Sequence, residues 1–218
     1  MIQWSAIDTV FLDMDGTLLD LYFDNHFWRE HMPRRYAEYH GLDEAAARAH
    51  LDAHYERHAG TLNWYCLDFW SSELALDIVQ LKEEVVHLIA VRPDVPAFLR
   101  ALRESGRRVV MVTNAHPKSL GLKMRETRID AWFDALISSH QVGLPKEHPD
   151  FWQALQAIEP YDKARILFVD DSLPVLKSAQ VYGIAQLLAV CNPDSKQPHK
   201  DCGEFAGISS FEQVMPDA

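Results

Sequence analysis

Short runs of β-branched and other apolar residues alternate along the chain with segments of helical spacing. Five runs predict strands, at residues 9–12, 108–112, 133–137, 166–169 and 184–190. Helices are predicted between them at residues 96–104, 117–128, 151–158 and 172–182, where proline in a first turn or glycine after a last turn marks an end. Such alternation favours an α/β fold with a doubly wound parallel sheet, whose ligands bind beyond the carboxyl ends of the strands.

The segment from residue 21 to residue 90 interrupts this alternation, because it holds no strand-like run. Asp43 is predicted to cap a helix that ends near Gly60, and Asp77 a second helix that runs to about Ala90. The segment holds 11 of the 23 aromatic residues, enough large side chains for a core of its own. We therefore expect two domains, a helical cap at residues 21–90 and an α/β catalytic core formed by residues 1–20 and 91–218.

The overall charge restricts the partners that this chain can bind. The formal net charge is −11, with 32 acidic residues against 21 lysines and arginines. A surface of this sign repels nucleic acid polymers and anionic membranes, but a small anion can still bind in a locally basic pocket.

Cysteine usage and the N-terminal segment predict a soluble cytoplasmic protein. Cys66, Cys191 and Cys202 form no CxxC pair and are expected to be free thiols in a reducing compartment. Asp8, Asp13 and Asp15 lie within the most apolar stretch of the N-terminal segment, where a signal peptide has an uncharged core. No uninterrupted apolar run approaches the roughly 18 residues that span a bilayer.

The stretch VFLDMDGTLLD places Asp13 and Asp15 directly after the first predicted strand. Two carboxylates at the end of a buried strand repel each other unless a cation lies between them, and Mg²⁺ prefers such hard oxygen ligands. With a metal present, Asp13 can attack phosphorus and form an aspartyl-phosphate, while Asp15 exchanges protons with the leaving group and with water. Gly16 lets the backbone turn sharply and approach the ligand.

Three further motifs follow predicted strands or lie in loops at the same edge of the sheet. MVTNAHP supplies Thr113 and Asn114 to hold phosphate oxygens at a helix start, and GLPKEHP supplies Lys146 as a positive charge beside Asp13 and the phosphoryl group. LFVDDS supplies Asp170 and Asp171, two more carboxylates for the metal, one of which is also expected to cap the following helix. His116, within TNAHP, either contacts phosphate or only ends the loop.

The order of these motifs resembles that of the haloacid dehalogenase (HAD) superfamily of phosphohydrolases, over nearly the whole chain. The resemblance implies that Asp13 is the nucleophile and Asp15 the acid and base, with Thr113 and Lys146 in the catalytic set. It also implies that Mg²⁺ binds the Asp13 carboxylate, the Asp15 backbone carbonyl and Asp171, with Asp170 assisting. The insert resembles the helical cap that closes over the site in this superfamily and excludes water.

A narrower resemblance links TLNWYCLDFW, TNAHP and GLPKE to the branch of GMP/IMP nucleotidases, which implies a purine 5′-mononucleotide as the small-molecule phosphomonoester substrate. Asn63, Trp64 and Tyr65 are then the candidates to contact the base. Arg34 or Arg35 is an alternative reader of the 6-oxo group.

Other functions remain open on the same residues. Phosphoglycolate or a sugar phosphate fits the core under a different cap, and so does a phosphomutase reaction. Dehalogenation is disfavoured because it needs no second acid such as Asp15, and a binding role without catalysis predicts losses among residues that are all present. His50, His54 and His58 lie four residues apart and have metal-ligand spacing, but such a row is more typical of a solvated or cap-lining helix face.

Overall fold

The computed structural model describes residues 2–216, and its centre is a parallel sheet of six strands in the order β3-β2-β1-β4-β5-β6. The strands are β1 (Thr9–Leu12), β2 (Arg108–Thr113), β3 (Ala135–Ser138), β4 (Ile166–Asp170), β5 (Gln186–Val190) and β6 (Gly207–Ile208). All five predicted strands are confirmed, although β3 and β5 begin two residues later than expected. β6 was not predicted, because two residues carry no period.

Side chains from both faces of the sheet are buried beneath helices, as the predicted doubly wound fold requires. Val10 and Leu12 of β1 pack on one face against α7, whereas Phe11 packs on the other against α10 and α11. The core helices are α7 (Val95–Glu104), α8 (Pro117–Thr127), α9 (Ser139–Val142), α10 (Phe151–Leu155) and α11 (Leu173–Tyr182). Successive side chains of β1 point to opposite faces of the sheet, and both faces are buried. The strand pairs in parallel with β2 on one side and with β4 on the other.

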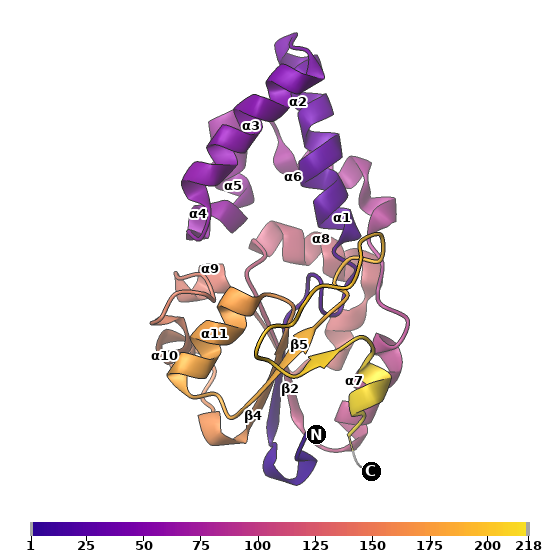
Figure 1. Cartoon of the computed structure of the whole chain (residues 1–218), viewed down its shortest axis with the longest axis vertical. Coiled ribbons are helices and arrows are strands. Elements are labelled where there is room, and N and C mark those ends of the chain that lie inside the picture. Colours follow the sequence, from indigo (N-terminus) through magenta and orange to yellow (C-terminus); the bar gives the residue numbers. More distant parts are fainter. Residues whose placement is uncertain (1, 217–218) are drawn as a thin grey trace.

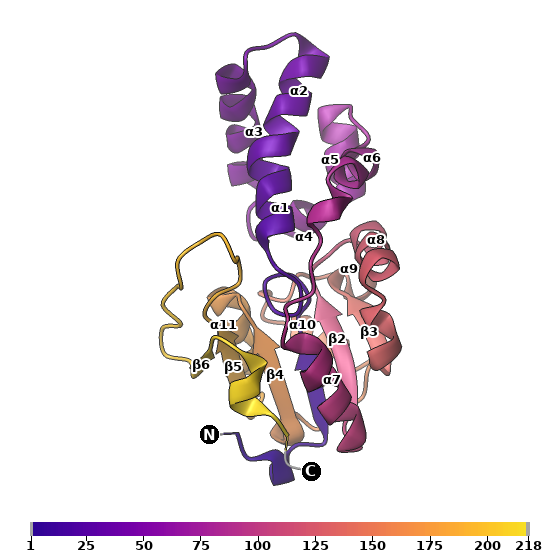
Figure 2. The same ribbon diagram turned by 90° about the vertical axis from the view of Figure 1, so that its right-hand side faces the viewer.

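The inserted helices form a cap beyond the carboxyl ends of the strands (Figures 1 and 2). They have an apolar core of their own, in which Phe27, Trp70 and Ile78 are fully or almost fully buried. They are α1 (Tyr22–His26), a π-helical turn (Phe27–His31), α2 (Met32–His40), α3 (Glu44–His58), α4 (Leu62–Tyr65), α5 (Leu67–Leu74) and α6 (Ile78–Glu84). The boundaries at residues 21 and 90 stay a prediction.

The predicted caps in the insert are confirmed, and one predicted helix is too long. The Asp43 and Asp77 carboxylates accept hydrogen bonds from the N–H groups of Ala46 and Gln80, respectively. The helix that begins after Asp77 ends at Glu84, not near residue 90, because the backbone leaves the helical conformation at Val85. α10 is also shorter than predicted and ends at Leu155.

The expectation of three free thiols is wrong for two cysteines. Cys191 and Cys202 form a disulfide, with 5.8 Å between their Cα atoms. Cys191 directly follows β5 and Cys202 precedes β6. Because these two strands are paired in the sheet, the loop that connects them ends close to where it begins. Gly207 lies against both sulfurs, where a side chain would collide. Within residues 2–216, no helix is both long and apolar enough to cross a membrane.

Candidate active site

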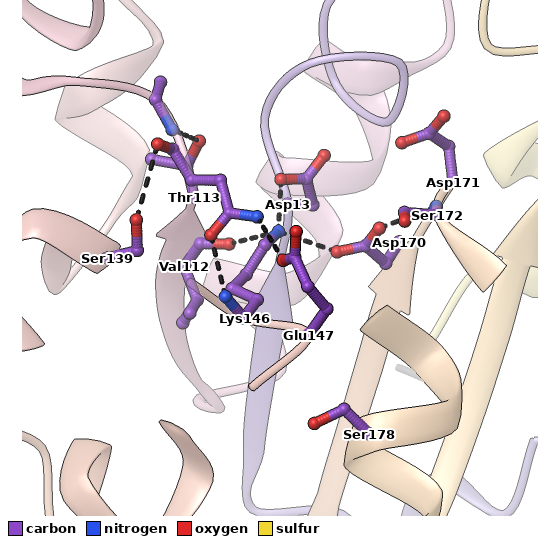
Figure 3. Close-up of polar contacts among 12 residues, drawn as sticks. Asp13, Val112, Thr113, Ser139, Lys146, Glu147, Asp170, Asp171, Ser172 and Ser178 are labelled. Atoms are coloured by element: carbon purple, nitrogen blue, oxygen red, sulfur yellow. Dashed lines mark hydrogen bonds and ion pairs between the residues drawn. The ribbon is translucent and has the colours of Figure 1, made fainter. Parts of the chain in front are cut away.

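The carboxyl ends of three adjacent strands place two carboxylates and one backbone carbonyl around one buried lysine (Figure 3). Asp13 follows β1, Asp170 ends β4, and Lys146 lies in the loop between α9 and α10. The Lys146 ammonium donates to Asp13 Oδ1 at 2.5 Å and to Asp170 Oδ2 at 2.7 Å. It also donates to the Val112 carbonyl at 3.0 Å, so all three of its protons have acceptors. Lys146 is therefore fixed by contacts to the ends of β1, β2 and β4.

These buried charges shift one another's protonation. Burial raises the pKa of Asp13 to about 6; Lys146 opposes this shift and Asp170 adds to it. Burial likewise raises the pKa of Asp170 and Asp171 to about 6. Burial alone would lower the pKa of Lys146, but Asp13 and Asp170 raise it above its ordinary value. The cluster thus carries more negative charge than Lys146 alone neutralises, a balance that favours a bound cation.

The donor set fits a hard divalent metal ion. One carboxylate oxygen each of Asp13, Asp170 and Asp171 lies within 4.8 Å of the other two. Octahedral Mg²⁺ with bonds of about 2.1 Å separates its ligand atoms by about 3 to 4 Å, so small side-chain rotations complete such a set. Lys200, which the sequence did not indicate, donates to the Asp171 backbone carbonyl and to its carboxylate at 3.1 Å.

Gly16 is placed where a side chain would collide with this acidic cluster. Its φ is +84°, and an added Cβ would lie 2.8 Å from Asp171 Cγ and 3.0 Å from Pro193 Cβ. Positive φ and the absence of a side chain together let the turn after β1 lie against Asp171.

The phosphate-binding candidates also tie β2 to the lysine loop. Thr113 ends β2, and its oxygen accepts the Ala115 N–H at 3.0 Å, so the hydroxyl proton can be donated elsewhere. Asn114 accepts the Lys146 N–H at 2.9 Å and donates to Glu147 Oε2 at 2.9 Å. Asn114 therefore orients the loop that carries Lys146.

Asp15 belongs to a second network of ion pairs, which the sequence did not reveal. Lys123 of α8 donates to Asp15 Oδ1 and to Asp24 Oδ2, at 2.6 Å in both cases. Lys82 of α6 donates to Asp24 Oδ1 at 2.7 Å. Both lysines are almost fully buried. Burial raises the pKa of Asp15 to about 6 against the opposing effect of Lys123. This network of ion pairs links Asp15 in the core to α1 and α6 in the cap.

Lys123→Met is expected to destabilise the protein by about 3 to 5 kcal/mol, because it removes the buried ammonium from half-buried Asp15 and leaves Asp24 with Lys82 alone. Lys82→Met should cost less, since Asp24 keeps Lys123. Urea unfolding at pH 7 measures both values. The control is Lys177→Met, which removes an exposed ion pair with Glu204 and should leave the unfolding midpoint nearly unchanged. Equal midpoints for Lys123→Met and the wild type would contradict the role of Lys123.

A cavity of about 630 Å³ extends from these groups into the cap. Trp64 and Tyr65 line it as expected, but Asn63 of the same short helix, α4, is exposed and does not line it. The Tyr65 hydroxyl donates to Glu147 Oε1 at 2.8 Å and so joins the cap to the lysine loop. Trp28 and Tyr55, which were not predicted, also line the cavity, and their rings lie edge to face with centroids 5.7 Å apart.

The arginines at the cavity are not those expected. Arg34 lies beside His31, and Arg35 pairs with glutamates, so neither lines the cavity. Arg29 and Arg48 line it instead, and Arg48 donates to the Arg29 carbonyl. Arg29 lies in the π-helical turn, whose extra residue changes which side chains face the core and could not be read from a 3.6-residue period.

The histidines divide into two groups. His116 lines the cavity and precedes α8, where its Nδ1 accepts the Lys118 N–H at 3.3 Å. His140 of α9 lies beside it, and burial lowers the pKa of both, that of His140 to about 4. The three histidines of α3 lie on the cap, where His50 is exposed and the other two are half-buried. His50 stacks on Tyr36, His54 contacts the His50 carbonyl, and His58 packs edge to face on Phe69.

Comparisons with known proteins agree with this arrangement. Residues 7–183 match the model of a hydrolase family described as haloacid dehalogenase-like hydrolase. The chain is 40% identical over 215 residues to GMP/IMP nucleotidase YrfG from Escherichia coli, which covers 99% of this chain and 97% of that protein. Among solved structures, a HAD phosphatase from Thermococcus onnurineus has a TM-score of 0.76 at 21% identity, covering 95% of this chain and 96% of its own. The magnesium-bound HAD-hydrolase YfnB from Bacillus subtilis has a TM-score of 0.63 at 17% identity, again covering 95% and 96%.

Proposed function

This chain is a phosphatase of the haloacid dehalogenase-like hydrolase family, and we propose that it hydrolyses purine 5′-mononucleotides, IMP and GMP, with Mg²⁺ as cofactor. One observation carries the proposal: the same cavity is lined by Asp13 and Lys146 in the core and by aromatic and arginine side chains in the cap. Its volume of about 630 Å³ is within the range of about 300–1,000 Å³ found for small-molecule sites.

In the first proposed step, a carboxylate oxygen of Asp13 attacks phosphorus and forms an aspartyl-phosphate. The bond from phosphorus to the nucleoside O5′ breaks, and Asp15 gives its proton to that oxygen. Lys146, held at 2.5 Å from Asp13, offsets the negative charge that the incoming phosphate brings. The Thr113 hydroxyl binds a phosphate oxygen, and the N-terminus of α8 adds positive potential beside it.

In the second proposed step, Asp15 removes a proton from water, the water oxygen attacks phosphorus, and the bond to Asp13 breaks. Inorganic phosphate leaves, and the Asp13 carboxylate is restored. Asp13, Asp170, Asp171 and the Asp15 carbonyl would hold Mg²⁺, which supplies positive charge between the carboxylates and the phosphate. Lys123 acts as a positioning residue, because it fixes the Asp15 side chain at 2.6 Å.

The cap residues suggest how the base is selected. Trp64 and Tyr55 offer aromatic faces on which any purine can stack. IMP and GMP present O6 and N7 side by side as two acceptors, the pattern that an arginine binds with two hydrogen bonds, whereas AMP presents an amino donor at that position. Arg29 and Arg48 are the arginines that line this cavity within residues 2–216, and we assign this recognition to them. IMP lacks the 2-amino group, so its hydrolysis would mean that this group is not essential.

We expect kcat/KM for IMP and GMP to exceed that for AMP by about 5- to 150-fold, which corresponds to about 1–3 kcal/mol for one two-pronged arginine contact. The measurement is phosphate release from IMP, GMP, AMP and a pyrimidine monophosphate on one preparation. Arg29→Met or Arg48→Met should reduce the preference, whereas the matched control Arg57→Met on α3 should retain it, because Arg57 bonds its own helix. Equal values for AMP and IMP, or faster hydrolysis of phosphoglycolate or a sugar phosphate, would contradict the purine assignment while leaving the phosphatase intact.

A further inference from the structure

Three side chains typical of transition-metal sites meet where the cap faces the core, apart from the carboxylate cluster. Cys66 lies between α4 and α5, His116 precedes α8, and His140 belongs to α9. One ligand atom of each lies within 4.8 Å of the other two. In Figure 1 the lower end of the cap, at α4, faces α9. One ligand therefore comes from the cap and two from the core.

The hydrogen bonds of His140 determine which ring nitrogen carries its proton. The Ser138 hydroxyl donates its single proton to the Ala115 carbonyl at 2.7 Å. Its oxygen lies 3.3 Å from His140 Nδ1 and can then only accept, so Nδ1 carries the hydrogen. The His140 Nε2 consequently presents a lone pair. This atom is buried and has no hydrogen-bond partner within residues 2–216. A buried lone pair left unsatisfied costs free energy, which a bound cation would recover.

The other two side chains direct ligand atoms to the same place. His116 Nε2 lies 3.7 Å from Asp68 Oδ2, so this nitrogen faces the cap. Cys66 is a free cysteine at the start of α5, and its sulfur accepts the Phe69 N–H at 3.4 Å. Asp68 adds a carboxylate beside the group, where it pairs with Lys118 at 2.5 Å. The set thus comprises one sulfur, two imidazole nitrogens and a nearby oxygen.

We propose that Cys66, His116 and His140 form a binding site for Zn²⁺ that is separate from the magnesium site. One sulfur and two imidazoles suit Zn²⁺, whereas Mg²⁺ prefers oxygen ligands. Bonds of about 2.3 Å to sulfur and 2.1 Å to nitrogen separate tetrahedral ligand atoms by about 3.3 to 3.6 Å. The atoms must therefore approach by at most about 1.5 Å, which side-chain rotation supplies. Binding through Nε2 of His116 gives up the 3.3 Å hydrogen bond to its Nδ1, because the ring proton moves there.

A metal ion bound at this place would join the cap to the core. His116 also lines the substrate cavity, so the ion would lie beside the route by which ligands enter and leave. Because exchange of substrate and product requires the cap to move, bound Zn²⁺ is expected to slow turnover. This inhibition rests on the proposed phosphatase function, whereas metal binding does not.

The test uses Co²⁺ as a spectroscopic probe for Zn²⁺ on the intact protein in buffer that contains Mg²⁺. Wild-type protein should bind one equivalent with the charge-transfer absorption of a cobalt–thiolate bond, and one equivalent of Zn²⁺ should abolish it. Cys191 and Cys202 are bonded to each other, so this absorption reports Cys66. Cys66→Ser should remove the signal. His140→Ala should weaken Co²⁺ binding by at least about tenfold.

His199→Ala is the matched control, because His199 is exposed and lies beside Ser209 in a different part of the chain, and its titration should match the wild type. Circular dichroism checks that each variant is folded; if Cys66→Ser is not, the His140→Ala titration decides. No thiolate absorption in the wild type, or equal Co²⁺ affinity in wild type and His140→Ala, would overturn the site. Zn²⁺ should also lower phosphate release by the wild type more than by Cys66→Ser, and equal inhibition of both would overturn the restraint on the cap.

Discussion

Asp13→Asn is expected to lower phosphate release from IMP by at least about ten-thousandfold while the protein stays folded. The amide keeps the shape of the carboxylate but has no anionic oxygen to attack phosphorus, and removal of a nucleophile has effects of this size. The substitution also removes one of two carboxylate partners of Lys146, which retains Asp170 at 2.7 Å. The fold should therefore survive, and a thermal melt followed by circular dichroism tests this directly.

Asp162→Asn is the matched control for this prediction. Asp162 is exposed and precedes β4, at the opposite end of that strand from Asp170, and its side chain accepts the Ala164 N–H. An asparagine oxygen can accept the same hydrogen bond, so turnover should equal that of the wild type. Phosphate release by Asp13→Asn within a few-fold of the wild-type rate would exclude the covalent mechanism and leave Asp13 only a metal-binding role.

The core of the site was predictable because its motifs directly follow strands. Asp13, Thr113 and Asp170 end or follow parallel strands that are neighbours in the sheet, so their meeting is a consequence of the strand order. Lys146 was found by its motif, and its contact with both carboxylates depends on the loop that Asn114 holds. Local patterns and one topological rule were sufficient for these residues.

The cap residues were less predictable, because their positions depend on helix phase and on packing between distant segments. The π-helical turn places Arg29 on the cavity, while Asn63 in the short helix α4 is exposed and does not line it. Lys82 and Lys123 are ordinary lysines in the sequence. Only the packing of α6 and α8 near α1 shows that they share Asp24.

The disulfide is a third case that local patterns do not reveal. Cys191 and Cys202 lie 11 positions apart without a recognised spacing, and their approach depends on β6, which has two residues. A strand this short has no readable alternation of apolar and polar residues. The pairing therefore follows from tertiary contacts between β5 and β6.

Removal of divalent metal ions is expected to stop turnover, and added Mg²⁺ to restore it. Without a cation, a phosphate dianion approaching Asp13, Asp170 and Asp171 meets repulsion of about 4 kcal/mol per charge pair at 4 Å and an effective dielectric constant of 20. Even one such pair uncompensated corresponds to a loss of about a thousandfold. Phosphate release after EDTA treatment and gel filtration, measured against added Mg²⁺, gives the size of the effect.

Asp171→Ala should raise the Mg²⁺ concentration needed for half-maximal turnover by at least about tenfold, because it removes one of the three carboxylates that we propose hold the ion. Its matched control is Asp150→Ala, which changes an exposed carboxylate in the loop that follows Lys146 and should leave the requirement unchanged. Zn²⁺ should not replace Mg²⁺, since the carboxylate cluster offers oxygen ligands only.

Full turnover in metal-free buffer would show that Lys146 and Lys200 alone offset the charge of the three carboxylates and the phosphate. The short contacts from Lys146 to Asp13 and Asp170 argue against that outcome, because this lysine has no proton left to donate to a phosphate oxygen.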